Sequence, residues 1–143
     1  MKSGTGTPID QGSQASSPAA SGTVGFTVTY TASDNGGGSG LAKVDLYAKA
    51  PGDAAYAKVA TDSTPSATGS FGYTAQKGDG NYSFYTLATD KSGNAESAPA
   101  SPDSTTVLDT AAPTSSAGSP QTTGSTGFTV TYNALAGVTG LAK

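Results

Sequence analysis

Acidic and amide side chains carry most of the chemistry that this sequence could do, and they gather in two stretches. Asp34 stands just before a run of glycines, and Asp90, Asn94 and Glu96 occur together further along the chain. Carboxylate and amide oxygens are ligands of Ca²⁺, which takes about 6–8 of them. If the two stretches meet in space, Asp34, Asp90, Asn94 and Glu96 are candidate calcium ligands, and Asp10 could join them. The alternative is that Asp and Asn beside Gly form turns by bonding their own backbone.

The residue types that are missing exclude several other kinds of site. The 143-residue chain has no Cys, His, Arg or Trp. Disulfides, thiolate or imidazole metal sites and a Ser-His-Asp triad are therefore impossible. The 7 Lys residues are dispersed, the net charge is only −3, and no apolar run reaches the ~18 residues of a membrane helix. We therefore expect no enzyme, no nucleic-acid partner, no membrane insertion, and no cofactor other than calcium.

Apolar and polar residues alternate along several short stretches, which is the pattern of half-buried β-strands. These stretches are residues 14–17, 24–32, 41–50, 56–61, 70–75, 81–89 and 104–108. Clusters of Gly, Asp, Asn and Pro separate them, as expected for turns. About seven short strands in about 100 residues predict a β-sandwich. The side chains expected in its core are Phe26, Val28, Leu46, Tyr82 and Phe84.

The sequence also contains an internal repeat. Residues 25–30, GFTVTY, recur as residues 127–132 at an offset of 102, and residues 40–43, GLAK, recur as residues 140–143. A period near 100 residues indicates a tandem array of whole domains. We therefore expect residues 1–11 to be an entering linker or a remnant of an excised fragment, residues 12–109 to be one domain, residues 110–122 to be a linker, and residues 123–143 to be the truncated first strands of the next repeat.

Three motifs resemble those of bacterial immunoglobulin-like and fibronectin-type-III-like surface repeats. Residues 80–84, GNYSF, resemble the G-x-Y-x-C approach to the sixth immunoglobulin strand, in which the Tyr hydroxyl bonds back to the preceding corner. Residues 88–94, ATDKSGN, and residues 107–114, VLDTAAPT, resemble a loop and an interdomain joint of the surface repeats. The resemblance implies a seven-stranded immunoglobulin-like Greek-key sandwich in which Phe84 stands at the Cys position. It also implies a bacterial cell-surface or secreted protein.

The resemblance implies where the candidate sites lie on the fold. In an immunoglobulin-like sandwich the loops that hold Asp34 and Asp90 share one pole, and several such repeats rigidify their joints with calcium. The equivalent loop of the second repeat, residues 133–139, has no carboxylate, which weakens a general structural role for the metal.

On the same fold, Tyr47, Tyr85 and Leu87 are expected to face outward from neighbouring strands. They form either a cross-strand pair that stiffens the sheet or a contact surface for a sugar or a protein.

These expectations together predict a non-enzymatic, extracellular repeat that acts as a spacer, stalk, adhesive or assembly unit. Its expected partners are neighbouring repeats and, through residues 123–132, a second copy that takes up this segment by strand exchange. The alternative for this segment is an inert tail. The alternative for the whole chain is a carbohydrate- or protein-binding module that presents Tyr47, Tyr85 and Leu87 to a glycan or a surface protein.

Overall fold

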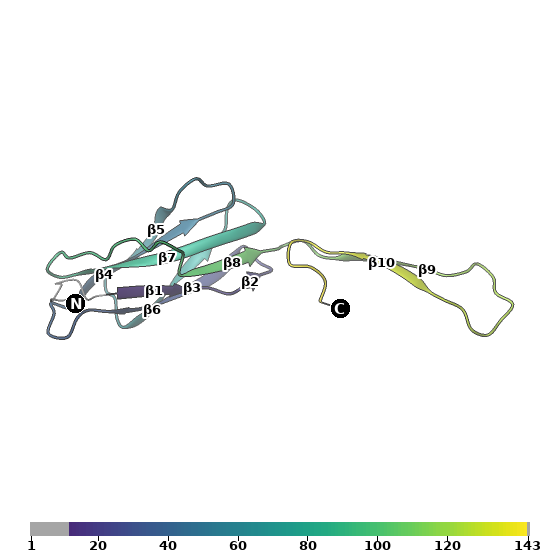
Figure 1. Cartoon of the computed structure of the whole chain (residues 1–143), viewed down its shortest axis with the longest axis horizontal. Coiled ribbons are helices and arrows are strands. Elements are labelled where there is room, and N and C mark those ends of the chain that lie inside the picture. The colour runs from purple at the N-terminus through teal and green to yellow at the C-terminus, as the bar shows by residue number, and fades with distance from the viewer. Residues whose placement is uncertain (1–11, 143) are drawn as a thin grey trace.

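Short β-strands make up the regular structure of this protein (Figure 1). The computed structural model describes residues 12–142, and these residues contain no helix. The strands of this part of the chain are β1 (Gly12–Ser16), β2 (Ala20–Ser21), β3 (Gly25–Ser33), β4 (Leu41–Lys49), β5 (Ala57–Asp62), β6 (Thr68–Thr74), β7 (Gly80–Asp90), β8 (Ser104–Leu108), β9 (Thr114–Gly118) and β10 (Thr131–Leu135). The all-β prediction is confirmed, while the interpretation of residues 1–11 lies outside the described residues.

Alternation of side chains explains why the long strands form and which way they face. In β3 the side chains of Val28, Tyr30 and Ala32 are buried, and the threonines between them are exposed. β-Branched and aromatic residues favour this half-buried, pleated environment. Strands β3, β4 and β7 begin and end within one residue of the predicted limits, because a period of two is clear in all three.

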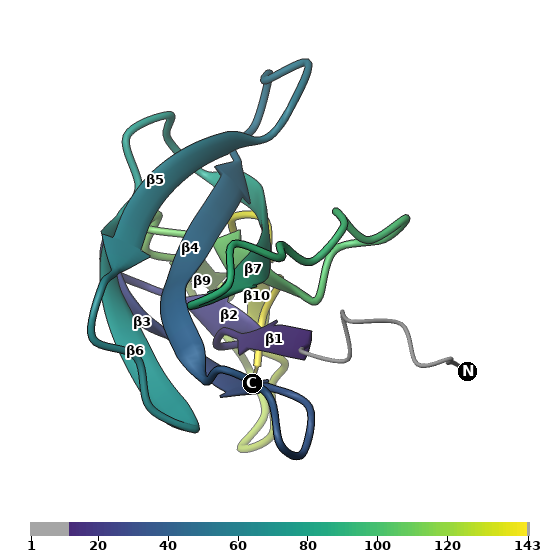
Figure 2. The same ribbon diagram turned by 90° about the vertical axis from the view of Figure 1, so that its left-hand side faces the viewer.

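Strands β1 to β8 form two sheets that face each other, which we call the two-sheet body (Figure 2). In the three-stranded sheet, β3 lies between β1 and β6 and is antiparallel to both. The other sheet has the order β2-β8-β7-β4-β5, and its neighbours are antiparallel except that β2 runs parallel to β8. The two-residue strand β2 was not predicted. It places the chain on the second sheet directly after β1.

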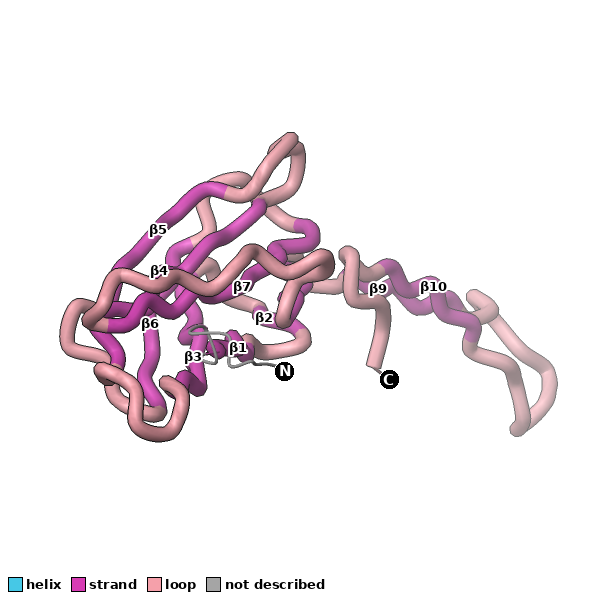
Figure 3. Tube along the Cα trace, turned by 60° about the vertical axis from the view of Figure 1, so that its left-hand side comes forward, coloured by secondary structure: helices cyan, strands magenta, loops and turns pink. Residues whose placement is uncertain are grey.

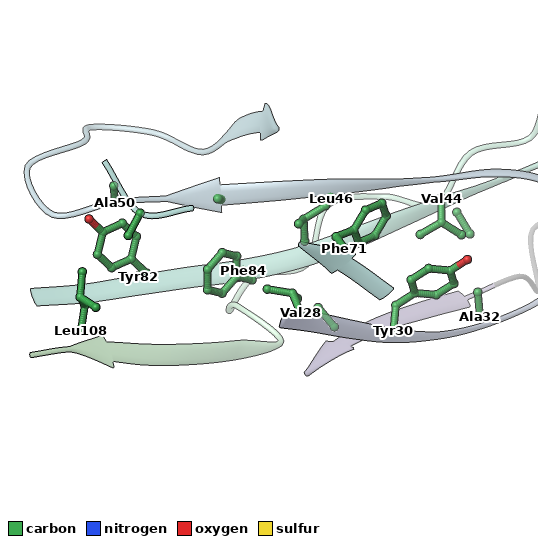
Figure 4. Packing of buried hydrophobic residues seen from close by; sticks show 14 residues of the cluster. Val28, Tyr30, Ala32, Val44, Leu46, Ala50, Phe71, Tyr82, Phe84 and Leu108 are labelled. Carbon is green, nitrogen blue, oxygen red and sulfur yellow. The ribbon is translucent and has the colours of Figure 1, made fainter. Parts of the chain in front are cut away.

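The hydrophobic core fills the space between these sheets (Figure 4). Four of the five predicted core residues are fully buried, namely Val28, Leu46, Tyr82 and Phe84. Phe26 is only half-buried and packs at the margin of the core. The ring of Phe84 meets the rings of Phe26 and Tyr73 edge to face, at centroid distances of 5.9 and 4.9 Å. Phe84 is therefore the aromatic centre of a core that otherwise contains many small residues.

Tyr82 fixes the corner through which the chain enters β7. Its hydroxyl donates a hydrogen bond to the carbonyl of Gly78 at 2.8 Å and accepts one from the N–H of Lys77 at 3.0 Å. The predicted bond from this hydroxyl back to the preceding corner is confirmed. Gly78 and Gly80 have φ angles of 80° and 138°, which glycine adopts without the cost that a side chain would impose.

Strands β9 and β10 form a separate two-stranded sheet that extends away from the two-sheet body (Figures 1 and 3). We call residues 114–135 the hairpin. Its register repeats that of β1 and β3, because Tyr132 pairs with Ala117 as Tyr30 pairs with Ala15, at an offset of 102 in both strands.

Side-chain bonds of the hairpin repeat at the same offset. The hydroxyl of Thr131 donates to the carbonyl of Gly118 at 3.3 Å, as the hydroxyl of Thr29 donates to the carbonyl of Ser16 at 3.3 Å.

The prediction that residues 110–122 are a plain linker is wrong for β9. This Ser- and Thr-rich stretch lacks apolar alternation, which is why its sequence predicts a linker. Backbone pairing with β10, rather than burial of apolar side chains, makes it a strand, since all five of its residues are exposed. The signal that could have revealed it is the repeat itself, because an offset of 102 carries β1 onto β9.

Candidate functional site

The predicted calcium ligands lie in loops that the structure does bring together at one pole. Lys91 N–H donates to the carbonyl of Gly40 at 2.9 Å, which joins the loop after β3 to the loop after β7. Asp34 accepts hydrogen bonds from the N–H groups of Asn35 at 2.8 Å and of Gly40 at 2.6 Å. Its carboxylate thus closes the glycine-rich loop on itself.

Asp90 organises the second of these loops. Its carboxylate accepts hydrogen bonds from Ser92 N–H at 2.9 Å, from Asn94 N–H at 2.8 Å and from the Asn94 side-chain amide at 2.8 Å. The hydrogen bond from the Asn94 side chain, together with those from the backbone, holds the pKa of Asp90 below its usual value. This is the turn-forming role that Asp and Asn play in ordinary loops.

Glu96 lies further along the same connection from β7 to β8, where its carboxylate reaches both sheets. Its carboxylate accepts hydrogen bonds from the hydroxyl and the N–H of Ser13, at 2.6 and 3.1 Å, and from the N–H of Ala88 at 2.9 Å. Asp103 has a parallel role that the sequence did not predict, because it accepts from the N–H groups of Ala15 at 2.9 Å and Thr86 at 3.1 Å. Two carboxylates therefore fasten β1 to β7 across the gap between the sheets.

These bonds decide how well the donor set fits a metal. Residues 12–142 contain no group of three or more His, Cys, Asp or Glu side chains that could hold an ion. Asp34, Asp90 and Glu96 each direct their oxygens at backbone N–H groups, so the set does not fit the 6–8 oxygen ligands of Ca²⁺ in this arrangement. Asp10 lies outside the described residues, and the calcium interpretation stays a prediction.

The predicted aromatic patch exists, but its centre is covered. Tyr47 and Tyr85 are directly opposite on β4 and β7, and their rings stack at 5.0 Å with an interplanar angle of 11°. Tyr56, which follows β4 in a loop, packs on Tyr85 at 4.7 Å. Tyr85 is 8 % exposed, and burial raises the pKa of its hydroxyl. The expectation that Tyr85 faces solvent is therefore wrong, because two other rings cover it, while Tyr47 and Leu87 are half-buried.

A buried carboxylate lies beside this patch on the same outer face. Asp45 is contacted by Lys43 Nζ at 2.9 Å, by the Thr61 hydroxyl at 2.5 Å and by Lys58 Nζ at 3.7 Å. Burial would raise the pKa of Asp45, but the hydrogen bonds from Thr61 and Lys43 outweigh burial and lower it. The acid is thus held ionised as a cross-strand anchor.

The hairpin presents the largest exposed apolar side chains of the described chain. Phe128 and Val130 are each 56 % exposed and Tyr132 is 77 % exposed. Their counterparts at an offset of 102 are Phe26, Val28 and Tyr30, which face the core of the two-sheet body. We call the residues that correspond to inward positions of the body, namely Ala117, Phe128, Val130, Tyr132 and Ala134, the open face of the hairpin.

Only part of the predicted assembly segment, residues 123–132, is a strand. Strand β10 begins at Thr131, whereas residues 127–130 have no strand partner within the described chain. The two-sheet body explains the difference. There, β1 pairs only with residues 29–33 of β3, and residues 25–28 pair with β6 alone. Residues 114–142 contain a counterpart of β1 and none of β6, which is why residues 127–130 have no strand partner in this part of the chain.

Specific hydrogen bonds join the end of the body to the segments on either side of the hairpin. Asp109 accepts from the hydroxyl and the N–H of Thr139, at 2.6 and 2.7 Å. Asp79 accepts from the hydroxyl and the N–H of Thr110, at 2.9 and 3.0 Å. The hydroxyl of Thr139, together with its N–H, lowers the pKa of Asp109. The sequence indicated a polar joint here but did not identify these bonds.

Comparisons with protein-family models, with curated protein sequences and with solved structures find no significant match to this chain. The residues described contain no helix of the length and hydropathy needed to cross a membrane. Of the groups of residues above, the open face of the hairpin is the one with large exposed apolar side chains.

Proposed function

We propose that this chain is a non-enzymatic structural protein built from repeated two-sheet domains, in which residues 114–142 are the first strands of a second domain. The observation that carries the proposal is the shared register of β1–β3 and β9–β10 at an offset of 102. Strands β9 and β10 pair residue by residue as β1 and β3 do, and two unrelated strands would not match another pair in this way by chance. In this proposal the protein works as a spacer, stalk or assembly unit on a bacterial surface or in a secreted assembly.

The finer fold that we propose is an immunoglobulin-like Greek-key sandwich. Strands β1, β3 and β6 take the places of strands A, B and E, and β4, β7 and β8 take those of C, F and G, in the sheet neighbourhoods that immunoglobulin domains have. The bond from the Tyr82 hydroxyl to Gly78 supports this proposal, because immunoglobulin-like sandwiches have a tyrosine at this corner.

The joint and the acidic residues support a structural role. Asp109 and Asp79 bond the body to the segment that follows it, as a protein that transmits force or sets spacing requires. Asp34, Asp90, Glu96 and Asp103 accept backbone N–H groups that order loops and strands. We propose that no cofactor takes part.

A chain with a completed second domain tests this function. Residues 44–109 would be appended after Lys143, which continues the repeat because residues 140–143 match residues 40–43. Pulled from its ends, the longer chain should show two unfolding events, each releasing roughly 300 Å at about 3.3–3.6 Å per residue. The original chain should show one. A single event in the longer chain would show that the hairpin is not the beginning of a second domain.

A binding module is the second candidate, and the half-buried rings beside Tyr85 favour it. Tyr47 and Tyr56 each keep part of their ring exposed, and Lys49 Nζ lies 5.9 Å from the Tyr56 ring centre. Aromatic faces with a cation at their rim are suited to stacking on a sugar. Screening on a glycan array decides this candidate, with Tyr47→Ala expected to abolish any binding and Lys91→Ala, at the pole near Gly40, expected to preserve it.

A further inference from the structure

We propose that the hairpin is a second donor of the first strand pair, which replaces β1 and β3 in the two-sheet body of another copy of this chain when that copy's own pair is weakened. The inference rests on the proposed function in one respect, since it treats β9–β10 as a second version of β1–β3. It goes further by naming the partner of the open face, which is a body whose own first strands have left.

The inward side chains of the two strand pairs are identical. In β1 and β3 these are Ala15, Phe26, Val28, Tyr30 and Ala32, and all five belong to the core or pack against it. At an offset of 102 the same residue types stand at Ala117, Phe128, Val130, Tyr132 and Ala134. A change of even one methylene in a core costs stability, so identity at every inward position removes this cost of exchange.

Outward positions are free to differ, and several of them do. Thr31 and Ser33 are replaced by Asn133 and Leu135, and both of the original side chains are exposed. The differences therefore fall where the body has no packing to lose.

The polar anchors of the first strands are also present in the hairpin. In the body, Ser13 binds Glu96 through its hydroxyl, and Tyr30 donates to Asp62 at 2.7 Å. The hairpin has Ser115 and Tyr132 at the matching positions. The bond from Ala15 to Asp103 uses only a backbone N–H, which any residue but Pro supplies.

The unpaired segment of the hairpin, residues 127–130, can supply the strand pairing that residues 25–28 make with β6. Residues 127–130 have exposed side chains and no partner strand among residues 12–142. In a body, the counterpart residues pair with β6 from Gly25↔Thr74 to Val28↔Phe71. Entry into a second copy would give residues 127–130 these backbone partners and would bury Phe128 and Val130.

The donor enters another copy rather than its own body. Ser13 lies at the end of the body marked by Glu96, whereas Leu108, the last residue of β8, pairs with Ser21 at the opposite end. Within one chain, residues 109–114 would have to run back along the body and break the bond from Thr139 to Asp109. Exchange between copies keeps that joint, and because it is head-to-tail it can continue from copy to copy.

The free-energy balance of the exchange determines in which variant of the chain exchanged assemblies can be detected. In an unmodified chain each incoming hairpin displaces an equivalent β1–β3 pair, so the apolar area gained and lost is nearly equal. Association also costs translational and rotational freedom. The unmodified chain is therefore expected to be mainly monomeric at low concentration, and weakening β3 alone should shift the balance to exchanged assemblies.

The test is Val28→Ser in the full chain, with Val28→Ser/Val130→Ser as the matched control. Val28 is fully buried, so the serine weakens β3 while the hairpin keeps its intact Val130. We expect the single variant to form assemblies whose mass, measured by light scattering, rises with concentration. Its melting temperature should exceed that of the double variant by more than about 5 °C. Val130→Ser alone should match the unmodified chain in both measurements.

Each outcome bears on the proposal. Equal mass and equal melting temperature for the single and double variants would overturn it. A monomeric single variant with a melting temperature above that of the double variant would also overturn it, because the exchange would then occur within one chain. These outcomes leave the two-domain pulling experiment unaffected, so the two ideas fail separately.

A disulfide can locate the exchanged strand, because the chain has no Cys of its own. Thr29 pairs with Ser70, and both are exposed. In the Val28→Ser background, Ser70→Cys with Thr131→Cys should give chains linked to one another on a non-reducing gel. The control pair, Ser70→Cys with Thr29→Cys on otherwise unmodified protein, should link within one chain. Absence of linked chains in the first variant would overturn the placement of β10 beside β6.

Discussion

At the scale of single residues, stability is concentrated in a few large side chains. The chain has 4 Phe and 7 Tyr, and only 34 % of its residues are hydrophobic. Phe84, Tyr82 and Tyr30 are among the largest fully buried side chains. Loss of one such ring therefore removes a larger share of the core than it would in a leucine-rich protein.

Phe84→Ala is expected to lower the free energy of unfolding by about 3–5 kcal/mol, the usual cost of removing a buried ring and leaving a cavity. The matched control is Phe128→Ala, since Phe128 is 56 % exposed and its loss should change stability by at most about 0.5 kcal/mol. Urea unfolding followed by circular dichroism measures both. Similar effects of the two substitutions would contradict the assignment of Phe84 to the centre of the core.

Substitution of either of two buried threonines is expected to stabilise the protein. The hydroxyls of Thr86 and Thr106 have no hydrogen-bond partner in the described part of the chain. A buried hydroxyl without a partner costs free energy, so Thr106→Val is expected to raise the free energy of unfolding by about 1 kcal/mol. Thr61→Val is the control and should destabilise, because it removes the 2.5 Å bond to Asp45. A loss of stability in Thr106→Val would mean that this hydroxyl is satisfied in solution.

At the scale of strands and loops, the sequence predicts what alternation encodes and little else. Strand β8 has the predicted limits, and β3, β4 and β7 deviate by one residue, because one face of each is buried and the period is visible. Strands β2 and β9 were missed, since backbone pairing holds them and their side chains carry no periodic signal.

For the candidate sites, too, the sequence predicts strand faces but not contacts made by loops. The sequence placed Tyr85 on the outer face correctly, but it gave no sign that Tyr56 would fold over from a loop and cover it. It also identified Asp34 and Asp90 as oxygen donors without revealing that neighbouring N–H groups use those oxygens. Contacts between a loop and a sheet depend on three-dimensional geometry that residue spacing does not contain.

The pole formed by the loops after β3 and β7 gives a prediction about calcium. Because Asp90 accepts hydrogen bonds within its own loop, we expect equal melting temperatures in millimolar Ca²⁺ and in EDTA. Asp90→Ala should lower the melting temperature by the same amount in both solutions, because it removes the hydrogen bonds that form this loop. Stabilisation by calcium, about 2.7 kcal/mol at a hundredfold excess over Kd, would instead establish a metal site at this pole.

At the scale of the whole molecule, a compact body and an extended hairpin are held in a defined relation by hydrogen bonds at their joint. Thr139 belongs to the segment after β10, yet it bonds to Asp109 directly after β8. The loop that follows the hairpin is thereby tied to the end of the body. In a string of such domains, this bond would limit how far one domain bends relative to the next.

This joint should depend on pH. The pKa of Asp109 is lowered in the folded protein by the Thr139 hydroxyl and N–H. A depressed pKa means that the contribution of the bond is complete above the ordinary pKa of Asp and is lost as pH falls through the folded value. NMR titration of the Asp109 carboxyl measures this, and Thr139→Val should move its pKa back toward the ordinary value. An unchanged pKa in Thr139→Val would show that the threonine is not the cause.

The chemical type of this bond has a mechanical consequence. The two groups of Thr139 that donate to Asp109 are uncharged, a hydroxyl and a backbone N–H, so this contact is not an ion pair that dissolved salt would screen. In a string of these domains, this contact would therefore depend on acidity and little on ionic strength. A joint held in this way would keep the bond at low and high salt alike, and would lose it only in acid.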